Sequence, residues 1–141
     1  MSNAARTVST IIPSLRYRDA LAAIDWLCIA FDFEKHAVYA DGDIVHHAQL
    51  TFGNGMIMLG SVDNGSEYGK RIAQPDEIGG RETQSSYVIV ADADAHYARA
   101  QAAGATIVGA LEEKDYGGKG YSCRDPEGHL WSFGTYDPWK V

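Results

Sequence analysis

The stretch Ile44–Phe52 carries two side chains, His47 and Gln49, whose types suit chemistry on a small molecule. Residues two apart on a β-strand point to the same side, so both would face one ligand. Histidine titrates near neutral pH, which makes His47 the candidate catalytic residue for proton transfer or for a hydrogen bond. A structural histidine would give the same pattern. The adjacent His46 points to the opposite side, so the two cannot chelate a metal together.

Hydroxyl groups recur on other expected strands, at Tyr87, Ser122 and Ser132. With His47 and Gln49 they form the expected ligand-binding set, because a few polar groups on an apolar wall are typical of small-molecule pockets. Ordinary packing would account equally well for Tyr87. The strand-end residues Arg16 and Arg124 could meet an anionic group or be plain exposed charges.

The bulk composition narrows the functional class. The 141 residues are 45% hydrophobic with a net charge of −7, which fits a globular protein and argues against a nucleic-acid partner. Cys28 and Cys123 are the only cysteines and form no CxxC motif, so we expect reduced thiols. No apolar run approaches the ~18 residues of a membrane span. These features predict a cytoplasmic protein with no membrane partner.

The first half predicts one βαβββ module over about residues 8–63. Strands are expected over 8–17, 33–40, 44–52 and 56–62, with a helix from Asp19 to about Phe31. Asp41-Gly42 is a signal for a type I′ hairpin. The polar, glycine-rich stretch 64–82 lacks periodicity and is expected to be either a linker or a lid.

The second half repeats this order over about residues 84–136. Strands are expected over 84–90, 106–111, 120–124 and 129–136, and a helix over 92–103 that Gly104 terminates. His96 on this helix is expected to be solvated. A shift of 73 residues places Asp19 on Asp92 and Gly55 on Gly128, which indicates a duplicated module. The fold class is therefore α+β, with two tandem βαβββ modules in a single domain.

Successive side chains of a β-strand point to opposite faces of the sheet, so the sequence predicts which ones face the helices. The apolar residues expected to pack against the helices are Ala48, Leu50, Phe52, Val88, Val90, Trp131 and Phe133. The opposite rows would line a concave site, and they comprise His47, Gln49, Thr51, Ser85, Tyr87, Ile89, Leu130, Ser132 and Tyr136. Gly120 and Ser122 are the expected equivalents of His47 and Gln49.

The segment 125–134, DPEGHLWSFG, combines a tight turn with an apolar strand. This turn, the tandem modules and the strand-Asp-Ala-helix openings resemble the vicinal oxygen chelate superfamily of glyoxalase I, bleomycin-resistance proteins and extradiol dioxygenases. The resemblance covers about Val8 to Tyr136. It implies a curved, barrel-like mixed sheet around a concave site, often within a homodimer.

The resemblance also implies where a metal would bind. In metal-dependent members the ligands are His, Gln or Glu on the first and last strand of each module, and those positions fall here near Ile12, Leu59, Ser85 and Ser132. None of these carries an imidazole or a carboxylate, so we expect no metal and no cofactor. A register error of one residue would bring in Gln84 and His129 without completing a ligand set.

The sequence thus predicts a small-molecule-binding protein of the glyoxalase/bleomycin-resistance type that lacks a metal and sequesters an antibiotic or an aromatic metabolite. One alternative is a metal-dependent lyase, isomerase or dioxygenase of the glyoxalase group. Another is a metal-free enzyme with His47 as its base and Gln49 and Tyr87 orienting the substrate. A purely structural role also stays open, as does whether the modules pair within one chain or across a dimer.

Overall fold

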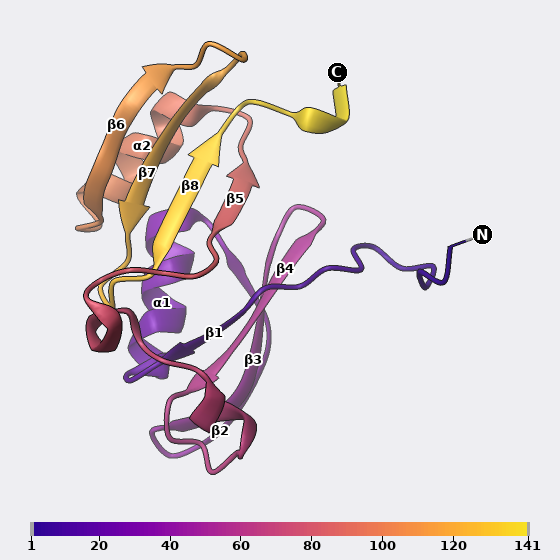
Figure 1. Ribbon diagram of the computed structural model, residues 1–141, viewed down its shortest axis with the longest axis vertical. Coiled ribbons are helices and arrows are strands. Elements are labelled where there is room, and N and C mark those ends of the chain that lie inside the picture. Colours follow the sequence, from indigo (N-terminus) through magenta and orange to yellow (C-terminus); the bar gives the residue numbers. More distant parts are fainter. Residues whose placement is uncertain (1, 141) are drawn as a thin grey trace. The chain divides into compact units, whose positions relative to one another are not determined.

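Two four-stranded sheets with the same topology make up the strand framework of the chain (Figure 1), whose computed structural model describes residues 2–140. The first sheet has the order β1-β4-β3-β2 and contains β1 (Ser14–Tyr17), β4 (Gly55–Ser61), β3 (Ile44–Phe52) and β2 (Glu34–Asp41). The second has the order β5-β8-β7-β6 and contains β5 (Ser86–Ile89), β8 (Leu130–Gly134), β7 (Lys119–Arg124) and β6 (Thr106–Glu113). In each sheet the first and last strands of the module pair in parallel and the other pairs are antiparallel. The predicted α+β fold with tandem βαβββ modules is confirmed, although strand pairing leaves each sheet open and closes no barrel.

Both helices begin at an aspartate, as predicted. The carboxylate of Asp19 accepts a hydrogen bond from the Ala22 amide at 3.1 Å before α1 (Ala20–Phe31), and Asp92 accepts one from Ala95 at 3.0 Å before α2 (Ala93–Ala102). Such a side chain satisfies one of the amides that a helix leaves unpaired at its start. Gly104, with a φ of 92°, follows the last turn of α2 and allows the chain to reverse.

Contacts divide the chain into two compact units, each with its own core. Unit 1 contains the residues up to Cys28 together with Asp32–Ile72. Its buried apolar side chains come from α1 and from one face of the first sheet, and include Ile24, Leu27, Ala48, Leu50, Ile57 and Leu59. The row Ala48 and Leu50 therefore lies on the buried side, as alternation predicted.

Unit 2 contains Ile29–Phe31 and the residues from Ala73 onward. Helix α2 packs against β6 and β7 (Figure 1). The ring of Phe31 contacts those of Trp131 and Phe133, with centroids 5.4 and 4.6 Å apart. These aromatic rings form the centre of the unit 2 core and confirm that Trp131 and Phe133 face the buried side of their strand.

His96 corrects one prediction, because it is only 7% exposed and lies inside unit 2. Its Nε2–H donates to the Phe31 carbonyl at 3.0 Å, so Nδ1 accepts from the Tyr121 hydroxyl at 2.6 Å. Ala93 and Ala100 are also buried. His96 shares their helical face at spacings of three and four, which explains why it is buried rather than solvated.

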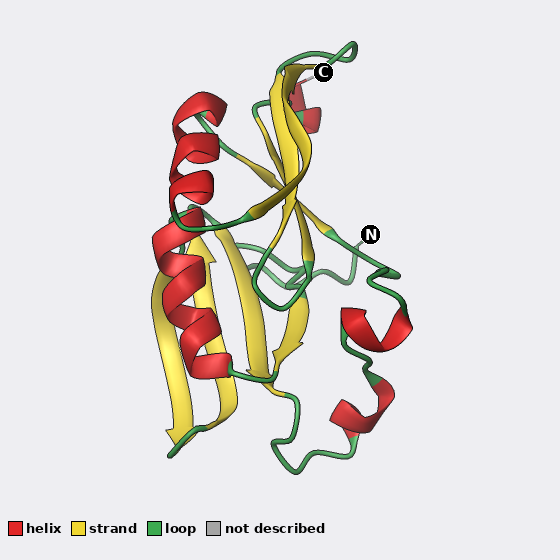
Figure 2. Ribbon diagram, turned by 90° about the vertical axis from the view of Figure 1, so that its left-hand side faces the viewer, coloured by secondary structure: helices red, strands yellow, loops and turns green. Residues whose placement is uncertain are grey.

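Three local features differ from the sequence expectation. Residues 8–13 form no strand, and β1 begins only after Pro13, which has no amide hydrogen to donate to a sheet. In the β2–β3 turn only Gly42, and not Asp43, has a positive φ, which is the type II′ pattern and not type I′. The stretch 64–82 contains two short 3₁₀ helices, Tyr68–Arg71 and Pro75–Ile78 (Figure 2).

Helix α1 is the longest helix, with 12 residues. Within residues 2–140, no helix combines the length and the apolar character that crossing a bilayer requires.

Candidate ligand-binding faces

The face of the first sheet opposite α1 carries His47 and Gln49, as the alternation of β3 predicted. Both side chains are half-buried, and their Nε2 atoms lie 3.0 Å apart. An amide nitrogen can only donate, so with the Gln49 amide assigned in this orientation the acceptor is Nε2 of His47. The ring of Tyr39 on the neighbouring strand β2 stacks on His47 with centroids 6.2 Å apart. The arrangement presents an oriented imidazole and an amide beside an aromatic surface.

The corresponding face of the second sheet brings together the three predicted hydroxyl residues. Ser122 lies opposite Ser132 on the β7–β8 pair, and their Oγ atoms are 2.7 Å apart. Tyr87 lies beside Ser132 on the parallel pair of β5 and β8. The structure thus groups Tyr87, Ser122 and Ser132 within unit 2, and His47 with Gln49 within unit 1.

A hydrogen bond to the segment that follows β8 holds the side chain of Tyr87. Its hydroxyl donates to the Tyr136 carbonyl at 2.7 Å, and its side chain is 44% exposed. Partial burial, followed by the nearby acidic groups of Tyr116, Asp137 and Tyr136, raises the pKa of the Tyr87 hydroxyl. The position depends on Gly134, because a Cβ at that residue would lie 2.7 Å from the Tyr87 hydroxyl oxygen. Tyr87 therefore presents a neutral ring in a fixed place.

The turn that resembles the family motif is organised by Asp125, a residue that sequence reasoning did not select. Its buried carboxylate accepts from the amides of Glu127 and His129, both at 3.0 Å, and from Nε1–H of Trp131, also at 3.0 Å. An aspartate that opens a turn is itself a signal for such bonds. Asp125 fixes both the turn and the indole that begins the buried row of β8.

Both arginines that could have met an anion instead bind main-chain oxygens. Arg16 Nη1 donates to the Ser61 carbonyl at 3.2 Å, and Arg124 Nη1 donates to the Gly128 carbonyl at 2.9 Å. Their hydrogen bonds favour a structural role. His129, which precedes β8, lies 2.8 Å from the Glu82 carboxylate and is buried.

The expected metal positions need a correction at Leu59. Leu59 is 2% exposed and pairs with Ala48 on the buried face of the first sheet. It therefore cannot line a site on the opposite face, the one that carries His47 and Gln49. We call this face, and the corresponding face of the second sheet with Ser122 and Ser132, the open face. The open-face residue equivalent to Ser132 is Met58, because Met58 pairs with Gln49 as Ser132 pairs with Ser122. Ile12 and Ser85 precede their strands. On the open face, Ser14 lies beside Met58 as Tyr87 lies beside Ser132.

The open-face residues of these four strands do not fit a divalent metal. They are Ser14, Arg16, Met56, Met58 and Gly60 in unit 1 and Tyr87, Ile89, Leu130, Ser132 and Gly134 in unit 2. None carries an imidazole or a carboxylate, the donors that hold such ions. Across residues 2–140, no three His, Cys, Asp or Glu side chains lie close enough together to bind one.

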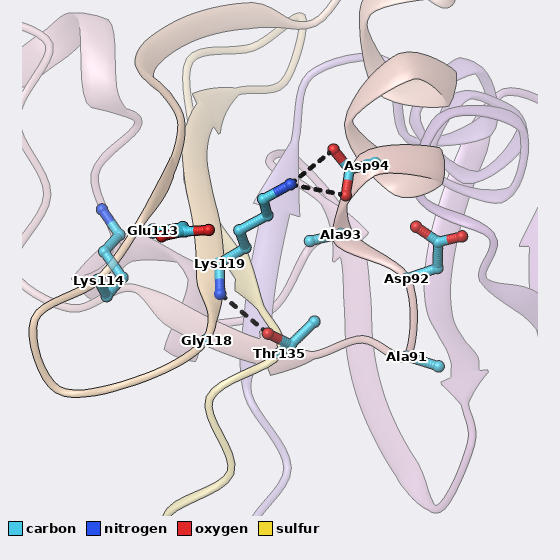
Figure 3. A pocket seen from close by; sticks show the side chains of 9 residues that line it. All are labelled: Ala91, Asp92, Ala93, Asp94, Glu113, Lys114, Gly118, Lys119 and Thr135. Atoms are coloured by element: carbon cyan, nitrogen blue, oxygen red, sulfur yellow. Dashed lines mark hydrogen bonds and ion pairs between the residues drawn. The ribbon is translucent and has the colours of Figure 1, made fainter.

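A surface pocket of about 520 Å³ lies elsewhere in unit 2, beside the start of α2 (Figure 3). Lys119 Nζ lies 3.1 Å from the Asp94 carboxylate across it, and the Lys119 amide donates to Thr135 Oγ1 at 2.9 Å. Glu113 and Lys114 add a further charge of each sign to its wall. None of the predicted ligand-binding residues lines this pocket.

Comparison with known proteins agrees with this architecture. A sequence profile of the Glyoxalase/Bleomycin resistance protein/Dioxygenase superfamily matches residues 8–133. The uncharacterized protein Mb0911c of Mycobacterium bovis is 35% identical over 124 residues, which cover 86% of this chain and 80% of that protein.

Solved structures show the same fold. The crystal structure of TioX from Micromonospora sp. ML1 matches with a TM-score of 0.71 and 37% identity, over 89% of this chain and 97% of TioX. The fosfomycin resistance protein FosX from Mesorhizobium loti matches with a TM-score of 0.65 over 94% of this chain and 95% of FosX, and at 15% identity it supports the fold alone. With the profile spanning both βαβββ modules, the chain belongs to the glyoxalase/bleomycin resistance protein/dioxygenase superfamily.

Proposed function

We propose that this chain binds a small, partly aromatic molecule and does so without a resident metal. The proposed binding residues are His47 and Gln49 on the face of the first sheet and Tyr87, Ser122 and Ser132 on that of the second. The observation that carries the proposal is the open faces themselves: half-buried polar groups cluster there, while the first and last strands offer no metal donor. Sequestration of an antibiotic or an aromatic metabolite would use such a surface.

The side chains supply complementary contacts for such a ligand. One of the paired Ser122 and Ser132 hydroxyls donates to the other, which leaves the second hydroxyl hydrogen to donate to a ligand and both oxygens to accept. The rings of Tyr87 and Tyr39 offer flat surfaces on which an aromatic group can stack. The proposal includes a homodimer in the cytoplasm, where Cys28 and Cys123 stay reduced and form no disulfide.

A thermal-shift screen with antibiotics and aromatic metabolites tests the proposal. A ligand at 100 times its Kd stabilises the folded state by about 2.7 kcal/mol, which raises the Tm by several degrees. The variants Ser132→Ala and Tyr87→Leu should weaken any hit, because the first removes a hydroxyl group and the second removes a stacking ring from the face of the second sheet.

Gln101→Ala, on the exposed surface of α2, is the matched control and should leave the shift unchanged. A screen without a hit would argue against ligand binding at the open face of the second sheet. Hits that the variants at Ser132 and Tyr87 do not weaken would argue against it as well.

A metal-free enzyme is the second candidate, and the half-buried imidazole of His47 on the face of the first sheet favours it. Gln49 Nε2 lies 3.0 Å from His47 Nε2 and orients the ring, and a substrate that displaces this contact would free the nitrogen to act as a base. His47→Asn keeps a polar side chain but removes the base. Turnover of a screened compound that this variant abolishes, with its binding retained, would support catalysis over sequestration.

A further inference from the structure

Three tyrosines gather at one end of the second sheet from three separate segments of unit 2. Tyr87 lies on β5, Tyr116 in the loop between β6 and β7, and Tyr136 directly after β8. The Tyr87 hydroxyl donates to the Tyr136 carbonyl at 2.7 Å, and the rings of Tyr116 and Tyr136 meet edge to face with centroids 4.9 Å apart. We refer to these three residues as the tyrosine cluster.

The tyrosine cluster keeps aromatic surface in contact with solvent. Tyr116 is 62% exposed and Tyr87 44% exposed, so neither ring is consumed by the unit 2 core. Exposed aromatic side chains that gather in one place mark binding surfaces more often than single exposed residues do. The fold therefore leaves these rings available.

The backbone around the tyrosine cluster is fixed before any ligand arrives. The Thr135 amide donates to the Lys119 carbonyl at 2.9 Å, and the Lys119 amide donates to Thr135 Oγ1 at 2.9 Å. Gly118 has a φ of 76°, and a Cβ there would lie 2.7 Å from the Tyr136 nitrogen. Because hydrogen bonds fix Thr135 and the carbonyl of Tyr136, Tyr136 loses little conformational entropy when a ligand binds.

The surroundings of the tyrosine cluster favour a positive charge. Tyrosine rings carry a negative electrostatic potential on their faces. Asp137 adjoins Tyr136 in the chain and is close enough to Tyr87 to contribute to the raised pKa of its hydroxyl, after burial and Tyr116. Asp115 precedes Tyr116.

The neighbouring lysines do not cancel this preference. Lys119 lies 3.1 Å from Asp94 and Lys114 lies 3.0 Å from Glu112, so each is paired with a carboxylate. Lys140 Nζ forms an ion pair with Asp137 Oδ2 at 3.9 Å. Because the Lys140 side chain is 83% exposed, this pair is weak, and a cationic ligand would compete with Lys140 for Asp137.

We propose that the tyrosine cluster, with Asp137, binds the quaternary or protonated alkylammonium group of a small molecule. This inference rests on the proposed function, since it shares Tyr87, and it adds the ligand class that the polar residues alone do not specify. The rings would supply cation–π contacts and Asp137 a longer-range attraction.

Choline and its neutral isostere 3,3-dimethylbutan-1-ol test the inference, because they share a shape and differ in charge. In ¹⁵N NMR titrations of the full chain, we expect choline to shift the amides of Tyr116, Gly118 and Tyr136 with a saturable curve. The neutral isostere should bind at least about twofold more weakly, which is the lower end of the range for the loss of one cation–π contact at an exposed site.

Variants separate ring electrostatics from packing. Tyr116→Leu should weaken choline binding about two- to fivefold, whereas Tyr116→Phe should retain it, because phenylalanine keeps the ring face. Asp137→Asn should also weaken it. Tyr68→Leu, which removes an exposed tyrosine outside the tyrosine cluster, is the matched control and should have no effect.

Equal binding of the two isosteres, or no saturable shift with choline, would overturn the inference. The proposed function is tested separately, since thermal-shift hits that Ser132→Ala weakens would uphold it even where choline fails. Choline binding that Ser132→Ala leaves intact would in turn support the tyrosine cluster alone.

Discussion

Asp125 is the residue on which the turn 125–129 depends, because a single buried carboxylate satisfies three N–H donors. Asp125→Asn keeps the shape but replaces one acceptor oxygen by an amide group that donates. We expect the free energy of unfolding to fall by about 2–3 kcal/mol, the cost of leaving buried donors unpaired. Urea denaturation measures the change.

Glu127→Gln, in the same turn, is a suitable control, since it is the backbone amide of Glu127 and not its side chain that binds Asp125. An Asp125→Asn variant as stable as the parent would show that solvent replaces the carboxylate.

Cys123 sets a dependence of stability on alkaline pH. Burial, followed by the charge of Asp125, raises the pKa of its thiol to about 12, from an ordinary value of 9.0. Between these two values the unfolded chain has lost the thiol proton while the folded chain retains it. The free energy of unfolding should therefore fall as the pH rises above 9, by about 1.4 kcal/mol per pH unit from this group.

In Cys123→Ala this part of the alkaline slope should disappear, as measured by urea denaturation between pH 8 and pH 10. The comparison concerns slopes, so the cavity that the substitution leaves does not affect it. Equal slopes in the parent and the variant would contradict the assignment.

At the scale of elements, the second sheet depends on the close approach of β5 to β8 at Gly134. An added Cβ would lie 2.7 Å from the Tyr87 hydroxyl oxygen and 3.1 Å from the Lys119 carbonyl oxygen. Gly134→Ala should destabilise the protein by about 1–3 kcal/mol, the usual cost of overpacking. Combining it with Tyr87→Phe should restore part of this loss, because the nearest atom is then absent. Thermal unfolding of the two single variants and the double variant measures the coupling.

Gly109→Ala on β6 is the matched control, since its added Cβ would meet only Ser122 at an ordinary 3.7 Å. A Gly134→Ala loss no larger than that of Gly109→Ala would argue against a close-packed Tyr87.

The starts of the helices and the order of helices and strands along the chain could be predicted from the sequence, because both rest on local signals. Asp19 and Asp92 cap their helices, and periodic apolar residues mark the strands that follow. The burial of His96 could not be predicted, because a histidine on a helix is compatible with both solvent and core. Its spacing from Ala93 and Ala100 was the one signal in the sequence that pointed to the core. The 3₁₀ turns within 64–82 carry no periodicity from which they could be predicted.

At the scale of the whole chain, the duplication predicted the βαβββ order of both modules. It did not predict, for every strand, which side chains lie on the open face and which on the buried face. Gln49 and Ser122 are 73 residues apart, whereas Met58 and Ser132 are 74 apart, because the second turn is longer. A slip of one residue moves a side chain to the other face of a strand. This is why Leu59 was placed in the site while it lies in the core. The slip left the expectation about the metal unchanged, since Met58 is no better a ligand for such an ion than leucine.

The first and last strands of each module carry no imidazole or carboxylate on their open faces, which leads to a prediction for the intact protein. Purified after expression with added zinc, nickel, manganese and iron, it should hold well under one metal ion per chain. Chelator treatment should change neither its Tm nor its ligand-induced shifts, because no residue on the first and last strands could lose a bound ion. Elemental analysis and thermal unfolding measure the metal content and the Tm.

The substitutions Met58→His and Ser14→Glu provide a positive control, because they place two donors side by side on β4 and β1. They should raise metal retention if this face can hold an ion. Near-stoichiometric metal in the parent chain, lost with a chelator together with stability, would instead point to donors outside these strands and to the metal-dependent alternative.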